Sequence, residues 1–205
     1  MSIDPYGGRE PTSHERRAGV PWDASYTDGP APWDVGRPQP AIVRVAATFI
    51  GPVLDAGCGT GENALHVAAR GVPVLGVDVA GSAIAIARDA AARRGIEAEF
   101  EVADALHLER LDRTFATVLD CGLFHTFDSE ERTAYVAALT AVTRAGGRLF
   151  VLCLNDQPHP VSEAELHAAF AGAAWRVATV VPERIETRFH AGGAVAWLAT
   201  VERLQ

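Results

Sequence analysis

The chain has few of the features that direct a protein to a membrane, a secretory route or a nucleic acid. It contains three cysteines among 205 residues, an odd number that argues against a disulfide framework and favours reduced thiols. No apolar run is long enough to span a membrane, and the first ten residues contain no apolar signal core. The net charge is −8 without a basic block, which is a poor basis for gripping a phosphate backbone. We therefore expect a cytoplasmic protein that binds neither membranes nor nucleic acids.

Metal-ligand spacing is also missing among the seven histidines and three cysteines, so no metal is expected. The length and a hydrophobic content of 48% allow one sizeable core, which we assign to residues 41–205. Residues 1–40 hold 7 of the 12 prolines and two of the four tryptophans. Proline-rich turns with embedded aromatic residues are stiff, and we expect this segment to form a cap over a cleft. The alternative is an extension that packs its tryptophans on the body without touching a ligand.

A strand, a glycine turn and a helix are predicted in succession over residues 53–65. Gly57, Gly59 and Gly61 occupy alternate positions, which lets the backbone pass close to a ligand where side chains would clash. The amides that open the following helix point into the same space. A turn of this kind at the carboxyl end of a first parallel strand is typical of a nucleotide site.

The spacing of the turn narrows the choice of ligand. A dinucleotide site has Gly-x-Gly-x-x-Gly, whereas here Gly57, Gly59 and Gly61 are followed by a glutamate. Asp55 enters the turn and Glu62 leaves it, and two carboxylates would repel a pyrophosphate. The same carboxylates suit a ligand that carries an ammonium and a sulfonium group, as S-adenosylmethionine does.

The segment VLDAGCGTG, residues 53–61, resembles the first motif of the class I S-adenosylmethionine-dependent methyltransferases, Val-Leu-Asp-x-Gly-x-Gly-x-Gly. The spacing of the later strands and acidic residues also agrees with that family, so the resemblance covers about residues 50 to 155. The resemblance implies an α/β fold with a Rossmann-like, seven-stranded, mostly parallel sheet, an antiparallel last strand, helices on both faces and an N-terminal cap. Matched to this sequence, the family's cofactor-binding positions are Asp55, Gly57, Cys58, Gly59, Gly61, Asp78, Val79, Asp104, Ala105, Asp120 and Cys121.

Two of these acids have specific implied roles. Asp78 ends the second predicted strand, 23 residues after Asp55, close to the roughly 20 expected for an acid that accepts both ribose hydroxyls. Nicotinamide enzymes use such an acid too, so this residue alone leaves an oxidoreductase open. In the family, an acid at the position of Asp104 takes the adenine amino group, and the next amide, of Ala105, meets the ring. Cys58 and Cys121 are expected near the cofactor as small packing residues without a catalytic role.

Apolar periodicity and turn residues predict the other elements. Helices are expected at 41–49, 63–69, 82–94 and 130–143, with Ser82 as a cap, and a capping box at 162–165 opens another. Strands are expected at 73–78, 98–102, 115–120 and 145–153. Segments 177–189 and 195–201 flank a glycine turn and are predicted to form an antiparallel hairpin.

A narrower resemblance lies in the proline-rich segment. Trp22, the run Pro32-Trp33-Asp34-x-Gly36 and Pro40 resemble the N-terminal cap of the thiopurine, thiocyanate, halide and thiol methyltransferases. Ala31 stands where that group has threonine. The resemblance implies that Trp33 packs against the methionine end of the cofactor, where an aromatic face beside a sulfonium is a favourable cation–π contact.

His125 is the candidate catalytic base. It follows the fourth predicted strand by a few residues, where a class I acceptor pocket begins, and imidazole titrates in the useful range. The alternative is a histidine that only packs or hydrogen-bonds in a loop. His14, Tyr26 and Tyr6 in the cap are weaker candidates for contact with the acceptor.

The resemblances imply methyl transfer from S-adenosylmethionine, with S-adenosylhomocysteine as product, to a small molecule. A thiol or thiolate is the first choice of acceptor because the cap matches and no strong base is evident. A phenol or quinol oxygen or a heterocyclic nitrogen comes next. Two other classes stay open, a nicotinamide-dependent oxidoreductase and a cofactor-binding protein without catalysis. Both a monomer and a homodimer are compatible with the sequence.

Overall fold

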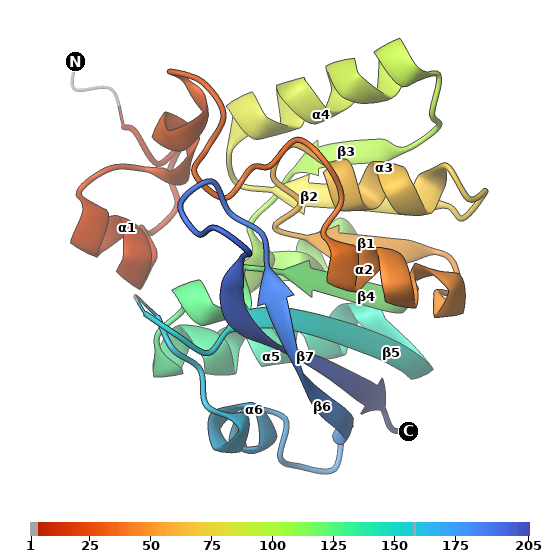
Figure 1. Cartoon of the computed structure of the whole chain (residues 1–205). Helices are drawn as coiled ribbons and strands as arrows, with labels where there is room; N and C mark the ends of the chain where they lie inside the picture. Colours follow the sequence, from red (N-terminus) through yellow and green to blue (C-terminus); the bar gives the residue numbers. More distant parts are fainter. Residues whose placement is uncertain (1–3, 158) are drawn as a thin grey trace.

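One seven-stranded sheet forms the centre of the protein. The computed structural model describes residues 4–157 and 159–205 (Figure 1). In spatial order the sheet runs β3-β2-β1-β4-β5-β7-β6. The strands are β1 (Val53–Ala56), β2 (Val74–Asp78), β3 (Glu99–Val102), β4 (Phe115–Cys121), β5 (Thr143–Leu154), β6 (Trp175–Ile185) and β7 (Ala194–Arg203).

Strands β1 to β5 pair with one another in parallel, and β7 runs antiparallel to both β5 and β6. All four residues of β1 are buried, as expected for a central parallel strand covered on both faces. This arrangement confirms the predicted fold class. The strand order reverses at β1, which lies between β2 and β4, and an open α/β sheet binds its ligands at the carboxyl ends beside such a switch point.

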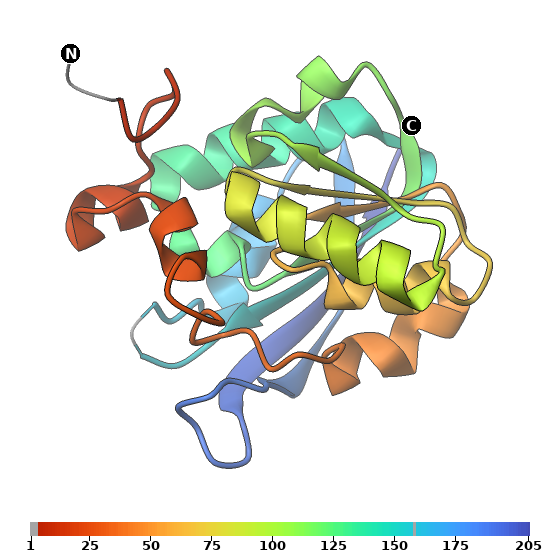
Figure 2. The ribbon, with the colours of Figure 1, turned by 90° about the horizontal axis from the view of Figure 1, so that it is seen from above.

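Helices cover the sheet on both faces, and Figure 2 shows α4 and α5 on opposite sides. On one face, Leu65 of α3 and Ile84 of α4 pack with Leu119 of β4. On the other face, Leu139 of α5 packs with Val118 of β4. The α-helices are α1 (Ser13–Ala18), α2 (Pro40–Val45), α3 (Glu62–Ala68), α4 (Gly81–Arg94), α5 (Ser129–Val142) and α6 (Glu163–Ala169). The 3₁₀ segments are η1 (Trp22–Tyr26), η2 (Ala46–Thr48), η3 (Ala105–Leu111) and η4 (Phe124–Thr126).

Two local expectations differ from the structure. The helix predicted at 41–49 is divided into α2 and the 3₁₀ turn η2. Ser82 does not cap α4, because the N-cap position is Ala80. Asp23, in η1 of the N-terminal segment, caps this helix from outside. Its carboxylate accepts from the Ser82 amide at 2.7 Å and from the Ser82 hydroxyl at 2.9 Å.

The N-terminal segment is anchored to the body at the carboxyl end of the sheet, beside α5 and the β6–β7 loop (Figures 1 and 2). Its helix α1 is held by the Glu15 carboxylate, which is fully buried and accepts from the Trp22 amide at 3.0 Å. The Ser13 hydroxyl donates to Glu131 of α5 at 2.6 Å. The first helix of the described residues begins at Ser13.

Within residues 4–157 and 159–205, no helix is both long and apolar enough to cross a bilayer.

Candidate active site

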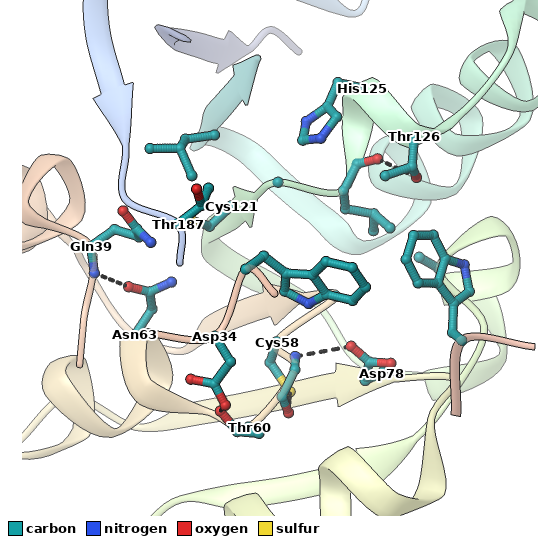
Figure 3. A pocket seen from close by; sticks show the side chains of 18 of the residues that line it. Asp34, Gln39, Cys58, Thr60, Asn63, Asp78, Cys121, His125, Thr126 and Thr187 are labelled. Atoms are coloured by element: carbon teal, nitrogen blue, oxygen red, sulfur yellow. Dashed lines mark hydrogen bonds between the residues drawn. The ribbon is translucent and has the colours of Figure 1, made fainter. Parts of the chain in front are cut away.

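A cavity of about 330 Å³ opens at the carboxyl ends of β1, β2 and β4. The N-terminal segment covers one side of it, and the loops after β4 and between β6 and β7 complete the wall. Figure 3 shows side chains from these separate parts of the chain pointing into the same space. A partly enclosed, mainly apolar cavity with a few polar groups is typical of a small-molecule site.

The glycine turn adopts the conformation for which its residues were singled out. Gly57, Gly59 and Gly61 have φ values of 70°, 52° and 83°, in the left-handed region that favours glycine. A Cβ at Gly61 would lie 2.8 Å from Phe100, so Gly61 packs inward and does not line the cavity. Gly57 and Gly59 do line it. The turn therefore brings bare backbone to the cavity at two of the three predicted positions.

Asp78 stands at the end of β2 and organises the turn. Its Oδ2 accepts from the Gly59 amide and its Oδ1 from the Ala80 amide, both at 2.9 Å (Figure 3 shows the first). Burial raises its pKa, while these two amides and the Arg9 guanidinium oppose the rise. A carboxylate has about four acceptor positions, so each oxygen keeps capacity for a further donor such as a ribose hydroxyl.

The residues predicted to bind the adenine ring also lie in the cavity wall. Asp104 and Ala105 line it, as does Val79. Oδ1 of Asp104 accepts from the Leu106 amide at 2.9 Å, which leaves Oδ2 available for an amino group. The structure thus places these three predicted positions in the cavity wall.

Asp55 and Asp120 lie beneath the cavity instead of in its wall. Both are buried, with exposed fractions of 1% and 0%, and burial raises the pKa of each to about 7. Successive residues of a strand face opposite sides of the sheet, which turns the Asp55 side chain toward the face that α3 covers. Asp120 accepts from the Leu123 and Phe124 amides, both at 3.0 Å, and so holds the loop after β4.

Glu62 lines the cavity, but its charge is paired. Its carboxylate pairs with Arg94 of α4, with a hydrogen bond of 2.9 Å. The sequence predicted that Asp55 and Glu62 would make the mouth of the turn acidic. In the structure, Asp78 and Asp34 also line the cavity, and both accept hydrogen bonds from residues of the glycine turn.

The cap brings Trp33 to the cavity, as the narrower resemblance implied. Its indole is 38% exposed, and its Nε1 donates to the Tyr26 hydroxyl at 3.1 Å. The adjacent Asp34 accepts from the hydroxyl of Thr60, in the glycine turn, at 2.9 Å, and Figure 3 shows the two side chains facing each other. This bond ties the cap to the turn and holds the indole over the cavity.

Gln39 is a positioning residue that the sequence did not indicate. Its amide accepts from the Glu186 N–H at 2.8 Å and donates to the Glu186 carbonyl at 2.9 Å. Its backbone N–H donates to Asn63 of α3 at 2.9 Å (Figure 3). It thereby joins the cap to α3 and to the β6–β7 loop. A single glutamine between two prolines carries no pattern that could have marked this role.

Four histidines line the cavity, although only His125 and His14 were predicted. His14, His125 and His159 form a cluster, and His190 lies apart from it in the β6–β7 loop. His14 stacks on Trp22 with ring centroids 4.2 Å apart, and His159 meets His14 edge-on at 5.4 Å. Nδ1 of His125 accepts from the Leu154 amide at 3.4 Å. Burial is the largest cause that lowers the pKa of all three, and it lowers that of His125 to about 3. This electrostatic setting argues against the base expected at His125.

The two cysteines expected near the cofactor, Cys58 and Cys121, line the cavity. Burial, together with the Asp55 carboxylate, raises the pKa of both thiols. They therefore stay protonated and weakly nucleophilic. Within the described residues, no cluster of three or more histidine, cysteine or acidic side chains could hold a metal ion.

Comparisons with known proteins agree with this site. Residues 53–147 match a family model described as a methyltransferase domain. The 2-heptyl-1-hydroxyquinolin-4(1H)-one methyltransferase of Mycobacteroides abscessus is 36% identical over 177 residues, which cover 80% of this chain and 78% of that protein. A probable thiol methyltransferase 2 of Arabidopsis thaliana is 22% identical over 182 residues, covering 80% and 77%.

Solved structures with a similar fold were also found. A chain from a study of the conversion of a disulfide bond into a thioacetal group during echinomycin biosynthesis has a TM-score of 0.77 and 37% identity, over 84% of this chain and 85% of that one. Magnesium protoporphyrin IX methyltransferase from Synechocystis, solved with S-adenosylmethionine, shares the fold at a TM-score of 0.65 and 20% identity, over 80% and 76%.

These matches confirm the predicted family, enzyme class and cofactor, and they set aside the oxidoreductase and the protein without catalysis. The glycine turn without side chains, the spare acceptor positions of Asp78 and Asp104 and the indole of Trp33 fit an adenosyl sulfonium compound. The chain belongs to the class I S-adenosylmethionine-dependent methyltransferases and acts on small molecules.

Proposed function

We propose that the acceptor of this methyltransferase is a small, largely apolar molecule whose nucleophilic atom reaches the cavity already ionised, in the first place a thiolate. The observation that carries the proposal is the histidine cluster of low pKa in the cavity wall. None of these rings is suited to take a proton near pH 7. Burial also raises the pKa of Tyr26, whose hydroxyl accepts from Trp33.

Acceptor chemistry follows from the weak proton affinity of this cluster. A thiol with an ordinary pKa of about 8.5 is a few per cent thiolate at neutral pH and is intrinsically nucleophilic. A phenol with a pKa of about 10 is ionised far less and needs help from a base. A site whose buried histidines resist protonation therefore favours sulfur over an ordinary phenol oxygen.

The chain's contribution is to bind the two reactants, to orient them toward each other and to exclude water from the cavity. When bound, S-adenosylmethionine supplies a methyl group on a positively charged sulfur, which is already a good leaving group. Asp78 would hold the ribose, and Trp33 would lie beside the sulfonium. The cap residues shield the cavity from solvent. Orientation of two reactants in this way can contribute roughly 7–11 kcal/mol.

The walls suit an aromatic or alkyl body on the acceptor. Leu123, Phe127 and Leu154 line the cavity, together with Phe189 from the β6–β7 loop. The Phe189 side chain is 72% exposed, and an acceptor against it would remove apolar surface from water. The expected acceptor is therefore an aryl or alkyl thiol of modest size.

An N-hydroxy heterocycle is the second candidate acceptor. The relative from Mycobacteroides abscessus is named for a 1-hydroxyquinolin-4(1H)-one with a heptyl chain, a flat ring with an apolar tail. The similar chain from the echinomycin study and the thiol methyltransferase relative support sulfur instead. Both acceptor types combine an ionisable heteroatom with an apolar body, as the cavity requires.

The test is a competition among acceptors of matched shape. The protein would be incubated with S-adenosylmethionine and an equimolar mixture of a thiophenol, an N-hydroxyquinolone and a phenol, and products that gain one methyl group would be followed by mass spectrometry. We expect methylation of the thiol first, the N-hydroxy compound second and the phenol least. Equal rates for the thiol and the phenol at pH 7, or no product from any acceptor, would overturn the proposal.

A further inference from the structure

We propose that His125 serves as a fixed hydrogen-bond donor, through Nε2–H, to the anionic atom of the acceptor, so that this residue selects acceptors by their acidity. The inference rests on the proposed function, in which the acceptor reaches the cavity ionised. It gives His125 a role opposite to that of the base expected from the sequence. The role follows from which ring nitrogen carries the proton.

The backbone of β5 fixes the tautomer of His125. Nδ1 accepts from the Leu154 amide at 3.4 Å. A backbone amide can only donate, so Nδ1 carries no proton, and the single proton of the neutral ring must be on Nε2. Leu154 is the last residue of β5 and pairs with Ala196 of β7, so its amide is held by the sheet. The ring lines the cavity, where Nε2–H is the polar group left to meet a ligand.

The groups around the ring keep it neutral. His14 comes from α1, His159 from the loop after β5 and Arg132 from α5, and all three disfavour a positive charge on His125. Arg132 is itself held in place, since its guanidinium donates to Glu165 at 3.2 Å and lies 5.1 Å from the Phe124 ring centroid. A proton taken up by His125 would create a buried imidazolium facing a fixed positive charge. A base at this position is therefore unfavourable, whereas a donor is not.

The transfer step needs no base when the acceptor is an anion. An electron pair of the acceptor forms the new bond to the methyl carbon, and the carbon–sulfur bond of the cofactor breaks with its electrons staying on sulfur. An anion and a cation become two neutral molecules, and no proton moves. A neutral donor at His125 stabilises the anion when it binds and carries no full charge that would oppose the approach of the sulfonium. The pH dependence should then follow the pKa of each acceptor instead of one ionisation of the enzyme.

Two variants separate a donor from a base. In His125→Gln the side-chain amide can donate a hydrogen bond from near the Nε2 position but cannot accept a proton from the acceptor. In His125→Leu the polar group is lost while the bulk is largely kept. If His125 donates, kcat/KM for a thiophenol should fall less than about fivefold in His125→Gln and about 10- to 100-fold in His125→Leu, as for a lost hydrogen bond to a charged group. If the glutamine variant is as impaired as the leucine variant, the proposal is overturned.

A binding measurement tests the same role without turnover. With S-adenosylhomocysteine present, 4-nitrophenol would be titrated by its visible absorbance to obtain its pKa when bound. We expect the wild type and His125→Gln to lower that pKa by about one unit relative to His125→Leu. The same bound pKa in all three proteins would overturn the donor role. Calorimetry with S-adenosylhomocysteine and thermal melting check that the variants fold and bind cofactor.

The failure of the proposed function is distinguishable from the failure of this inference. Absence of methylation of any thiol or N-hydroxy compound by the wild type removes the proposed function, while the nitrophenol titration still decides the donor role. Rates measured against pH for thiophenols of different acidity decide the inference when methylation occurs. Midpoints that move with the thiophenol support it, and one common midpoint contradicts it.

Discussion

Replacing Asp78 by asparagine gives the most direct test of how the glycine turn holds the cofactor. The Asp78 carboxylate accepts from the Gly59 and Ala80 amides, both at 2.9 Å, with one bond to each oxygen. Asparagine has a single acceptor oxygen, so its NH₂ group would face one of these two N–H donors. The substitution thus removes a charge-assisted bond to the backbone and replaces the acceptor that we assign to a ribose hydroxyl.

The expected magnitude follows from these contacts. A hydrogen bond to a charged group contributes about 1.5–3 kcal/mol. The loss of one such bond to the cofactor, with a disturbed turn behind it, should cost about 2–3 kcal/mol of binding free energy. This corresponds to an increase of about 30- to 150-fold in the Kd for S-adenosylmethionine.

Isothermal titration calorimetry with S-adenosylmethionine and S-adenosylhomocysteine is the assay. Glu101→Gln is a matched control, because Glu101 is an exposed acid on β3, opposite Val77, and does not line the cavity. It removes the same charge and should leave both Kd values within about twofold. A change of less than threefold for a folded Asp78→Asn protein would refute the assignment of Asp78 to the ribose.

Three further predictions concern stability. Burial raises the pKa of Asp55 to about 7, so the folded protein retains a proton that the unfolded chain releases near pH 4, and the stability from this group falls as pH rises from about 4 to 7. In thermal melts, the Tm of Asp55→Asn should therefore rise relative to that of the wild type across this pH range. A constant difference in Tm would contradict the reasoning. Gly61→Ala should lose about 1–3 kcal/mol in urea unfolding, because its φ is 83° and a Cβ would lie 2.8 Å from Phe100; an unchanged midpoint would show that the turn adapts. Glu15→Gln should loosen the cap, because the fully buried Glu15 pairs with Arg9, and trypsin should cut the cap faster. The pKa of Glu15 lies below its ordinary 4.5, so the wild-type cap should loosen in the same way only as pH falls through that lower value.

Features that depend on short-range geometry could be predicted from the amino-acid sequence alone. Alternate glycines require left-handed backbone angles, and the structure has them at Gly57, Gly59 and Gly61. Runs of apolar residues followed by an acid placed Asp78 and Asp104 at strand ends, where a parallel sheet collects its ligand-binding groups. Both of these features are decided within a few residues of chain. The resemblance around Trp33 also predicted that the cap reaches the cavity, although contacts between distant segments hold it there.

Tertiary structure decided what those residues can do, because charge, burial and hydrogen-bond partners come from segments far apart in sequence. Asp55 was expected to face the ligand, but the pleat of β1 points its side chain away from the cavity, beneath the glycine turn. Glu62 is paired with Arg94, which comes from another helix. His125 was predicted as a base by position alone. A backbone amide of β5, 29 residues later, occupies its Nδ1, and burial beside other cationic or ionisable side chains keeps the ring neutral. Proton affinity depends on the whole surrounding field, which only the folded chain creates.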